Sequence, residues 1–165
     1  MHNQSSDRKL VLDDQLCFSL YTASRLVTRA YAPLLAELGL TYPQYITMIA
    51  LWEAAAPTAV GELGERLHLD SGTLTPLLKR LETMGLVTRS RDAADERRVL
   101  VAPTAAGEAM RSIACLVPER MAARYGAEAA HLEALKRMLD GVIAALDESP
   151  AGAGAQSVAH TSSRG

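Results

Sequence analysis

The stretch VGELGERLHLDSGTLTPLLKRLETMG (residues 60–85) decides the fold, because it reads as two helices joined by a tight turn. Val60, Leu63 and Leu67 recur at helical spacing, and residues 68–70 close this first, short helix. Gly85 ends the second helix, whose apolar residues share one face: Leu74, Leu77, Leu78, Leu81 and Met84. Pro76 removes one helical hydrogen bond and predicts a loose first turn.

Two short β-like stretches, residues 86–89 and 98–101, follow and flank a polar tip at 91–97. This order of helix, turn, helix and hairpin predicts a winged helix-turn-helix. In that motif the second helix enters the major groove with its N-terminal half toward the bases, and free backbone N–H groups there favour phosphate. We therefore expect double-stranded DNA as a partner and five contact residues on this helix: Ser71, Thr73, Thr75, Lys79 and Arg80.

The hairpin adds a second group of candidate DNA contacts, because an arginine on a narrow wing can enter the minor groove. The candidates are Arg89, Arg91, Arg97 and Arg98. Three acidic residues lie among them, and we expect one, Asp95, to orient Arg97. Either element alone would fit a solvated helix or a charged hairpin. The formal net charge of −2 gives no support, so the prediction rests on the arrangement.

The segments on both sides carry apolar residues at helical spacing. Residues 12–38 predict a long helix with Asp13 as its N-cap and Pro33 near its end, and the run 45–52 predicts a buried helix that starts at Tyr42-Pro43. Pro103-Thr104 opens another helix, which Pro118 kinks, and a last helix carries a coiled-coil-like seam. These seams predict a homodimer.

The expected fold class is therefore mainly α with a small β-hairpin wing. We expect a flexible arm at 1–11, one domain at 12–148 and a disordered tail at 149–165. The domain would comprise dimerisation helices at 12–38 and 104–147 around a winged helix-turn-helix at about 43–102.

Length and composition fit a single globular domain: 165 residues, of which 48% are hydrophobic. Neither a signal segment nor an apolar run long enough to span a bilayer is visible, so we expect a cytoplasmic protein without a membrane partner. The chain has only two cysteines, Cys17 and Cys115. In a reducing compartment they would rest as thiols, so any special role would come from reactivity.

Cys17 follows the expected cap by four residues and so falls in the first turn of the long helix. Free N–H groups and the helix dipole favour a thiolate there. The alternative is a small buried hydrophobe between Leu16 and Phe18. Four of the five tyrosines follow Cys17 closely, namely Tyr21, Tyr31, Tyr42 and Tyr45, and a phenol can donate a hydrogen bond to a thiolate.

Tyr31 cannot reach the Cys17 of its own chain. Fourteen residues of straight helix separate the two by about 21 Å along the axis. In an antiparallel pairing of two long helices, the partner's Tyr31 and Tyr42 could reach it. A thiol site built from these residues is therefore intersubunit.

Five stretches resemble the organic hydroperoxide resistance regulators, a branch of the MarR family of winged-helix repressors. They are LCFSLY (16–21), LTYPQY (40–45), LWE (51–53), LDSGTLTPLLKRL (69–81) and DER (95–97). The resemblance covers about residues 12–147. The DNA-reading stretch is shared among MarR proteins, whereas the cysteine and tyrosine motifs mark the peroxide-sensing branch.

The resemblance implies that Cys17 is the sensing cysteine and that Tyr31 and Tyr42 bind it from the other subunit, with Tyr21 in support. Arg97 would be the wing arginine and Asp95 its carboxylate. A homodimer would repress a thiol peroxidase gene from a pseudo-palindromic operator until an organic hydroperoxide oxidises Cys17.

Oxidised Cys17 would then condense with Cys115 or with a small cellular thiol. In two-cysteine members the resolving cysteine lies nearer to residues 121–122. Cys115 is therefore a candidate resolving thiol, with a buried, inert thiol as the alternative.

Three other classes of function are alternatives: a ligand-released repressor, a thiol peroxidase and a metal sensor. A MarR-type repressor released by a non-covalent aromatic ligand would leave Cys17 structural. A thiol peroxidase enzyme is disfavoured, because residues 12–17 lack the peroxiredoxin pattern and no C-x-x-C pair is present. No metal or other cofactor is expected, since none of the scattered histidines shows ligand spacing with a cysteine: His2, His68, His131 and His160.

Overall fold

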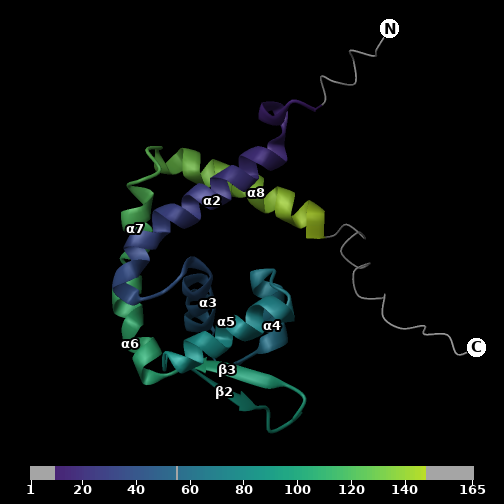
Figure 1. Cartoon of the computed structure of the whole chain (residues 1–165), viewed down its shortest axis with the longest axis vertical. Coiled ribbons are helices and arrows are strands. Elements are labelled where there is room, and N and C mark those ends of the chain that lie inside the picture. Colours follow the sequence, from purple (N-terminus) through teal and green to yellow (C-terminus); the bar gives the residue numbers. More distant parts are fainter. Residues whose placement is uncertain (1–9, 55, 148–165) are drawn as a thin grey trace, which may run out of the picture. The chain divides into compact units, whose positions relative to one another are not determined.

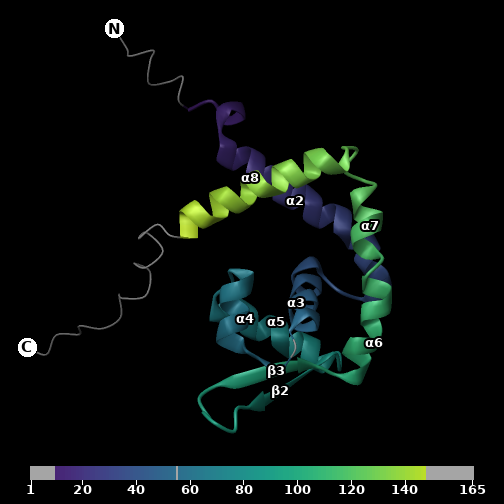
Figure 2. The same cartoon turned by 180° about the vertical axis from the view of Figure 1, so that it is seen from behind.

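The computed structural model describes residues 10–54 and 56–147 (Figures 1 and 2). The arm predicted at 1–11 falls largely outside the described residues, as do the tail at 149–165, His2 and His160. The chain forms two compact units, Met1–Arg124 and Tyr125–Gly165.

The N-terminal helix α2 spans Leu16–Leu35 and is shorter than predicted. The rest of the expected helix is two short 3₁₀ turns, η2 (Leu12–Asp14) and η3 (Ala36–Leu38). The prediction that Asp13 is the N-cap is wrong. Asp13 lies inside η2, and Gln15, in an extended conformation, precedes α2. A 3₁₀ turn repeats every three residues, so its apolar spacing resembles that of an α-helix.

Helix α3 (Tyr42–Glu53) forms the centre of the core, which confirms the prediction of a buried helix there. It contacts α2, α4, α5, α6 and strand β3. Thr41 and Gln44 start it with a capping box, in which the Thr41 backbone N–H donates to Gln44 Oε1 at 2.9 Å.

The helix-turn-helix consists of α4 (Val60–Leu67) and α5 (Ser71–Thr83). The wing is the hairpin of β2 (Val87–Arg91) and β3 (Val99–Pro103), and β1 (Thr58–Ala59) completes an antiparallel sheet in the order β1-β3-β2. The predicted winged fold is confirmed, with the strands displaced by one or two residues. Strand β1 was missed, because two residues carry no alternation pattern.

After the wing, the chain forms α6 (Ala105–Ala114) and α7 (Val117–Ala122). We predicted one helix kinked at Pro118, but the helix breaks earlier, at residues 115–116. Pro118 lies in the first turn of α7, where its missing N–H has no intrahelical acceptor to lose.

The start of α6 is fastened to the start of the wing. The Thr104 backbone N–H donates to the Leu86 carbonyl at 3.0 Å, and the Thr104 hydroxyl donates to the Gly85 carbonyl at 2.6 Å. A β-carbon at Gly107 would overlap the Leu86 carbonyl oxygen, so only glycine fits this approach. Both ends of the hairpin therefore meet at the first turn of α6.

The second unit contains α8 (Ala129–Asp147). Four large apolar side chains are exposed on this helix: Leu135, Met138, Ile143 and Leu146. Across residues 10–54 and 56–147, no helix combines the length and the apolar character that a membrane span requires.

Candidate functional site

The recognition helix α5 starts with a well-formed cap. The Asp70 carboxylate accepts the Thr73 backbone N–H at 2.9 Å and the Thr73 hydroxyl at 2.8 Å. These hydrogen bonds, the side-chain one first, lower the pKa of Asp70 below its ordinary value. The expectation of a loose first turn is wrong, because α5 runs unbroken through Pro76 from a capped start.

All five candidate contacts on α5 are exposed: Ser71, Thr73, Thr75, Lys79 and Arg80. Four apolar residues of the opposite face are buried as predicted, but Met84, the fifth, is 42% exposed. Met84 is the C-cap, where the chain leaves the helix toward Gly85. The Thr73 hydroxyl is engaged in the cap.

The turn between α4 and α5 depends on two unusual backbone positions. His68 ends α4 in a left-handed conformation, with φ of 50°. The Leu69 backbone N–H then donates to the Gly64 carbonyl at 2.9 Å, and a β-carbon at Gly64 would lie 2.9 Å from the Leu69 carbonyl oxygen. This close approach fixes how α5 leaves α4.

At the wing tip, Arg97 is the most exposed of the ion-paired arginines among residues 10–54 and 56–147, with a side chain 91% accessible. Asp95 Oδ1 accepts both the Arg97 backbone N–H and its Nε–H at 3.1 Å. The hydrogen bond to the guanidinium, followed by that to the backbone, lowers the pKa of Asp95. Asp95 thus contacts Arg97 as expected. Arg91 Nη1 donates to the Glu96 carbonyl at 2.6 Å.

The other two candidate arginines of the wing pair with acidic residues of the helix-turn-helix. Arg89 Nε donates to Glu82 Oε2 at 2.9 Å, and this bond lowers the pKa of Glu82. Arg98 Nη2 donates to Glu62 Oε1 at 2.7 Å. Both pairs join the wing to another element, Glu82 lying on α5 and Glu62 on α4, and the second pair spans 36 residues.

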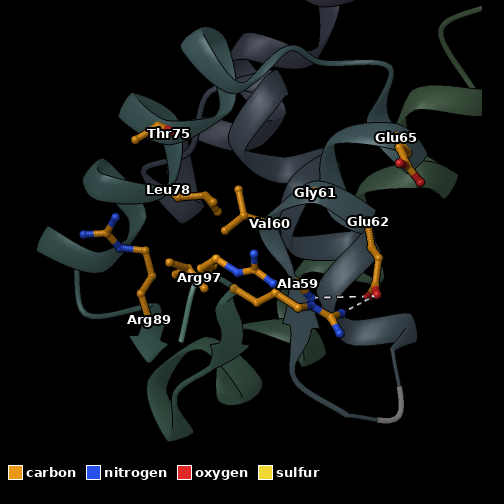
Figure 3. A pocket seen from close by; sticks show the side chains of 11 residues that line it. Ala59, Val60, Gly61, Glu62, Glu65, Thr75, Leu78, Arg89 and Arg97 are labelled. Carbon is orange, nitrogen blue, oxygen red and sulfur yellow. Dashed lines mark hydrogen bonds and ion pairs between the residues drawn. The ribbon is translucent and has the colours of Figure 1, made fainter. Parts of the chain in front are cut away.

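A cavity of about 650 Å³ lies between α4, α5 and the wing (Figure 3). Thr75 and Leu78 line it from α5, and Val60 and Glu62 line it from α4. All but one of the wing arginines line the opposite side: Arg89, Arg97 and Arg98.

Cys17 is exposed and is the second residue of α2. It therefore lies in the first turn, as expected, although the cap differs. The N–H groups of a helix's first turn have no intrahelical acceptor. The alternative of a cysteine buried within its own chain does not hold.

The candidate tyrosines separate into two places. Tyr31 and Tyr42 pack together with ring centroids 4.7 Å apart, joining α2 to α3. Tyr21 is exposed near the start of α2, where its hydroxyl accepts Arg25 Nη1 at 2.9 Å. The structure therefore brings Tyr31 and Tyr42 together but leaves Tyr21 in the half of α2 that carries Cys17.

Tyr45 belongs to the same cluster as Tyr31 and Tyr42. The sequence analysis did not include Tyr45 among the site residues. Its ring lies 6.0 Å from that of Tyr31, and it is only 2% exposed. Burial is the largest cause that raises the pKa of Tyr45, and electrostatic interactions with Tyr42 and Cys115 add to it. Its spacing of three residues from Tyr42 on one helix was the available signal.

Cys115 is exposed at the C-cap of α6, so the buried alternative is not what the structure shows. Its Sγ donates to the Ser112 carbonyl at 3.0 Å. Cys115 lines a groove of about 220 Å³ between α3 and the α6–α7 region, together with Tyr45, Trp52 and Arg111.

No group of three or more histidine, cysteine or acidic side chains in the described part of the chain could hold a metal ion. The features that remain are a capped recognition helix and a hairpin whose exposed arginine is held by an adjacent carboxylate. Together they define a winged helix-turn-helix DNA-binding regulator.

Comparisons with known proteins refine this class. A family model described as transcriptional regulator SarA/Rot matches residues 29–112. The organic hydroperoxide resistance transcriptional regulator of Bacillus subtilis is 48% identical over 72% of this chain and 78% of its own length.

Two solved proteins are also similar. The structure of reduced AbfR bound to DNA, a protein of Staphylococcus epidermidis, matches with a TM-score of 0.70 and 31% identity over 87% of this chain and 99% of that one. Disulfide-formed AbfR matches with a TM-score of 0.59, 33% identity and coverage of 84% and 97%. Wild-type MarR of E. coli matches with a TM-score of 0.64, 27% identity and coverage of 78% and 96%.

The chain belongs to the MarR family of winged helix-turn-helix transcription regulators. It is accordingly a regulator and not an enzyme.

Proposed function

We propose that this protein is a homodimeric repressor that binds a pseudo-palindromic operator and releases it when an organic hydroperoxide oxidises Cys17. The observation that carries the proposal is the exposed thiol in the first turn of α2, in a chain 48% identical to the B. subtilis organic hydroperoxide resistance regulator. The reduced and disulfide-formed structures of AbfR add support, since they belong to a relative that binds DNA and forms a disulfide.

Exposed apolar side chains support the dimer. Leu16, Tyr21 and Leu26 are each more than half exposed on α2, and α8 carries its own exposed apolar residues. Surfaces of this kind are typical of protein–protein interfaces. In the dimer, Tyr31 and Tyr42 of one chain would donate hydrogen bonds to the Cys17 thiolate of the other.

The chemistry takes place at Cys17 Sγ. The thiolate attacks the outer oxygen of the hydroperoxide, so an S–O bond forms as the O–O bond breaks, and the alkoxide leaves as an alcohol after taking up a proton. Sulfur loses two electrons, the peroxide gains them, and Cys17 becomes a sulfenic acid. A second thiol, from Cys115 of the partner or from a small cellular thiol, then displaces water to give a disulfide.

Release of DNA follows from geometry. A dimer of this class reads half-sites about 34 Å apart, so a small rotation of one DNA-reading lobe breaks the register. A sulfenic acid or mixed disulfide enlarges the surface around Cys17 and makes it more polar. Reduction by thiols restores the original surface and therefore the binding.

An electrophoretic mobility shift tests the proposal. DNA from upstream of the protein's own gene is bound by reduced wild-type, Cys17→Ser and Cys115→Ser proteins, then treated with cumene hydroperoxide and with dithiothreitol. We expect the wild type to release and rebind DNA and the Cys17→Ser protein to stay bound. Reversible release of the Cys115→Ser protein, with no small thiol present during oxidation, would show that oxidation of Cys17 to the sulfenic acid is sufficient and that Cys115 is not required.

If wild type and Cys17→Ser release alike, or neither releases, the cysteine switch is wrong. A repressor released by a non-covalent aromatic ligand would then be the better account, and that ligand would release both proteins.

A further inference from the structure

The position of the wing relative to the recognition helix is not fixed by packing alone. The cavity of about 650 Å³ separates the outer part of the hairpin from α4 and α5 (Figure 3). Side chains on opposite sides of a cavity make few dispersion contacts across it. Core packing holds the base of the hairpin, where Val87 and Val101 are buried, so other interactions must hold its outer part at its angle.

Two ion pairs connect the two sides. Arg89 on β2 reaches Glu82 near the end of α5, and Arg98 reaches Glu62 on α4. Glu62 is doubly used, because its second oxygen accepts the Ala59 backbone N–H at 3.4 Å in the capping box of α4 (Figure 3). The carboxylate of Glu62 is thereby oriented toward the hairpin.

Arg98 lies where the wing tip closes. Its backbone N–H donates to the Asp95 carbonyl at 2.9 Å, and its carbonyl accepts the Asp92 N–H at 3.0 Å. Its guanidinium also lies 3.8 Å from Asp92 Oδ2. The ion pair that fixes the Arg98 side chain therefore also restrains the loop that carries Arg97.

We propose that Glu62 and Arg98 form a positioning pair that holds the wing tip, and with it Arg97, at the angle required for operator binding. Glu82 and Arg89 support the base of the hairpin in the same way. Arg89 and Arg98 then act through the wing, whereas Arg97 contacts DNA. This inference rests on the proposed DNA binding but not on the redox switch.

The direction in which one substitution changes operator affinity distinguishes this positioning role from a simple effect of surface charge. Removing a carboxylate from a surface that faces DNA reduces repulsion and strengthens binding. Removing a positioning carboxylate weakens binding, because the wing tip loses its angle. Glu62→Gln is suited to the test, since glutamine retains an oxygen for the Ala59 N–H.

Glu65→Gln is the matched control. Glu65 lies on the same helix and lines the same cavity, and it carries the same charge. Operator affinity of the reduced protein is measured by fluorescence anisotropy, with thermal unfolding of each variant alongside. We expect Glu62→Gln to weaken binding about fivefold, the scale of a modest polar contact, and Glu65→Gln to leave it equal or tighter.

A second measurement detects positioning as distinct from stability. Arg97→Ala is introduced into wild type and into Glu62→Gln, and Arg98→Gln is combined with Glu62→Gln. We expect Arg97→Ala to cost less in the Glu62→Gln background, because Arg97 is already displaced there. The Glu62→Gln/Arg98→Gln protein should bind within about twofold of Arg98→Gln alone.

Three results would overturn the proposal. Glu62→Gln could bind as Glu65→Gln does, the losses from Glu62→Gln and Arg98→Gln could multiply, or Arg97→Ala could cost the same in both backgrounds. If wild type binds the operator and any of these holds, only the positioning pair fails. If wild type does not bind DNA, the proposed function fails as well.

Discussion

The DNA-reading region and the thiol region of this molecule are built in opposite ways. The DNA-reading region, from β1 to β3, orients many of its polar side chains through contacts within one chain, such as Asp70 with Thr73 and Asp95 with Arg97. In the thiol region, Cys17 is exposed near one end of α2, and the Tyr31–Tyr42 pair lies toward the other end. The first region can be understood from one chain, whereas the second, as proposed, is completed by a partner subunit.

This difference has a practical consequence for mutagenesis. Substitutions in the DNA-reading region should change operator affinity without changing the chemistry of Cys17. Substitutions in the thiol region should change the rate of oxidation without changing the affinity of the reduced protein. The following predictions test that separation, from the largest expected effect to the smallest.

Gly107→Ala should not respect the separation, because it should destabilise the whole fold. Gly107 lies where α6 meets the start of the wing. The new β-carbon overlaps the Leu86 carbonyl, so we expect the free energy of unfolding to fall by about 3 kcal/mol. Chemical denaturation measures the change. Gly61→Ala is the control, since a β-carbon there meets nothing within 4 Å and stability should not fall. Equal stability of both variants would disprove the close approach.

Arg97→Ala should sharpen the separation from the DNA side. We expect operator affinity to fall about tenfold, the scale of one lost arginine contact, and the salt dependence of binding to become shallower. The rate of Cys17 oxidation should not change. Arg120→Ala, which removes an equal charge from α7, should leave DNA affinity within about twofold. An oxidation rate that fell with Arg97→Ala would contradict the separation.

Tyr31→Phe and Tyr42→Phe should sharpen it from the thiol side. Each removes a hydroxyl that we propose donates to the partner's thiolate, so oxidation by cumene hydroperoxide should slow about fivefold. The rate is measured on the Cys115→Ser background as the loss of free thiol over time, which labelling with a maleimide detects. Tyr125→Phe serves as the control. Unchanged rates would place these hydroxyls away from the reacting sulfur.

Asp70 should give the smallest effect, seen as a pH dependence of stability. The pKa of Asp70 is lowered in the folded state, so its stabilisation is fully present above the ordinary carboxyl pKa of about 3.9 and is lost as pH falls through the lowered value. Asp70→Asn keeps a capping oxygen but does not titrate.

The difference in melting temperature between wild type and Asp70→Asn should therefore be constant from about pH 7 to 5 and shrink below about pH 4. A difference that did not depend on pH would show that ionisation of Asp70 contributes nothing to the cap.

The DNA-reading region was also the part most readily predicted from sequence. Its apolar positions repeat within a few residues, and Gly85 marks the end of α5 with a positive φ of 73°. The Asp95–Arg97 contact spans two residues and was accessible to the same local reasoning. Local periodicity and local hydrogen bonding account for these successes.

Sequence reasoning failed where the deciding contact was distant or the pattern ambiguous. Arg98 and Glu62 are 36 residues apart, so nothing local linked them. The spacing of apolar residues could not distinguish the η2 turn from the first turn of α2, which misplaced the cap at Asp13. Helix α6 ends at Ala114, with Cys115 as its C-cap, so the position of Pro118 did not predict where the helix ends.

The closure of the hairpin at Thr104 has a consequence for how this protein can change over evolutionary time. Because Thr104 bonds to both Gly85 and Leu86, the strands are held at their base whatever the length of the tip. Insertions and deletions at residues 92–97 then leave the register of strand pairing unchanged, and longer loops cost little entropy. If the wing tip contacts the operator as proposed, homologues can acquire new operators by altering the tip alone, without redesigning the sheet.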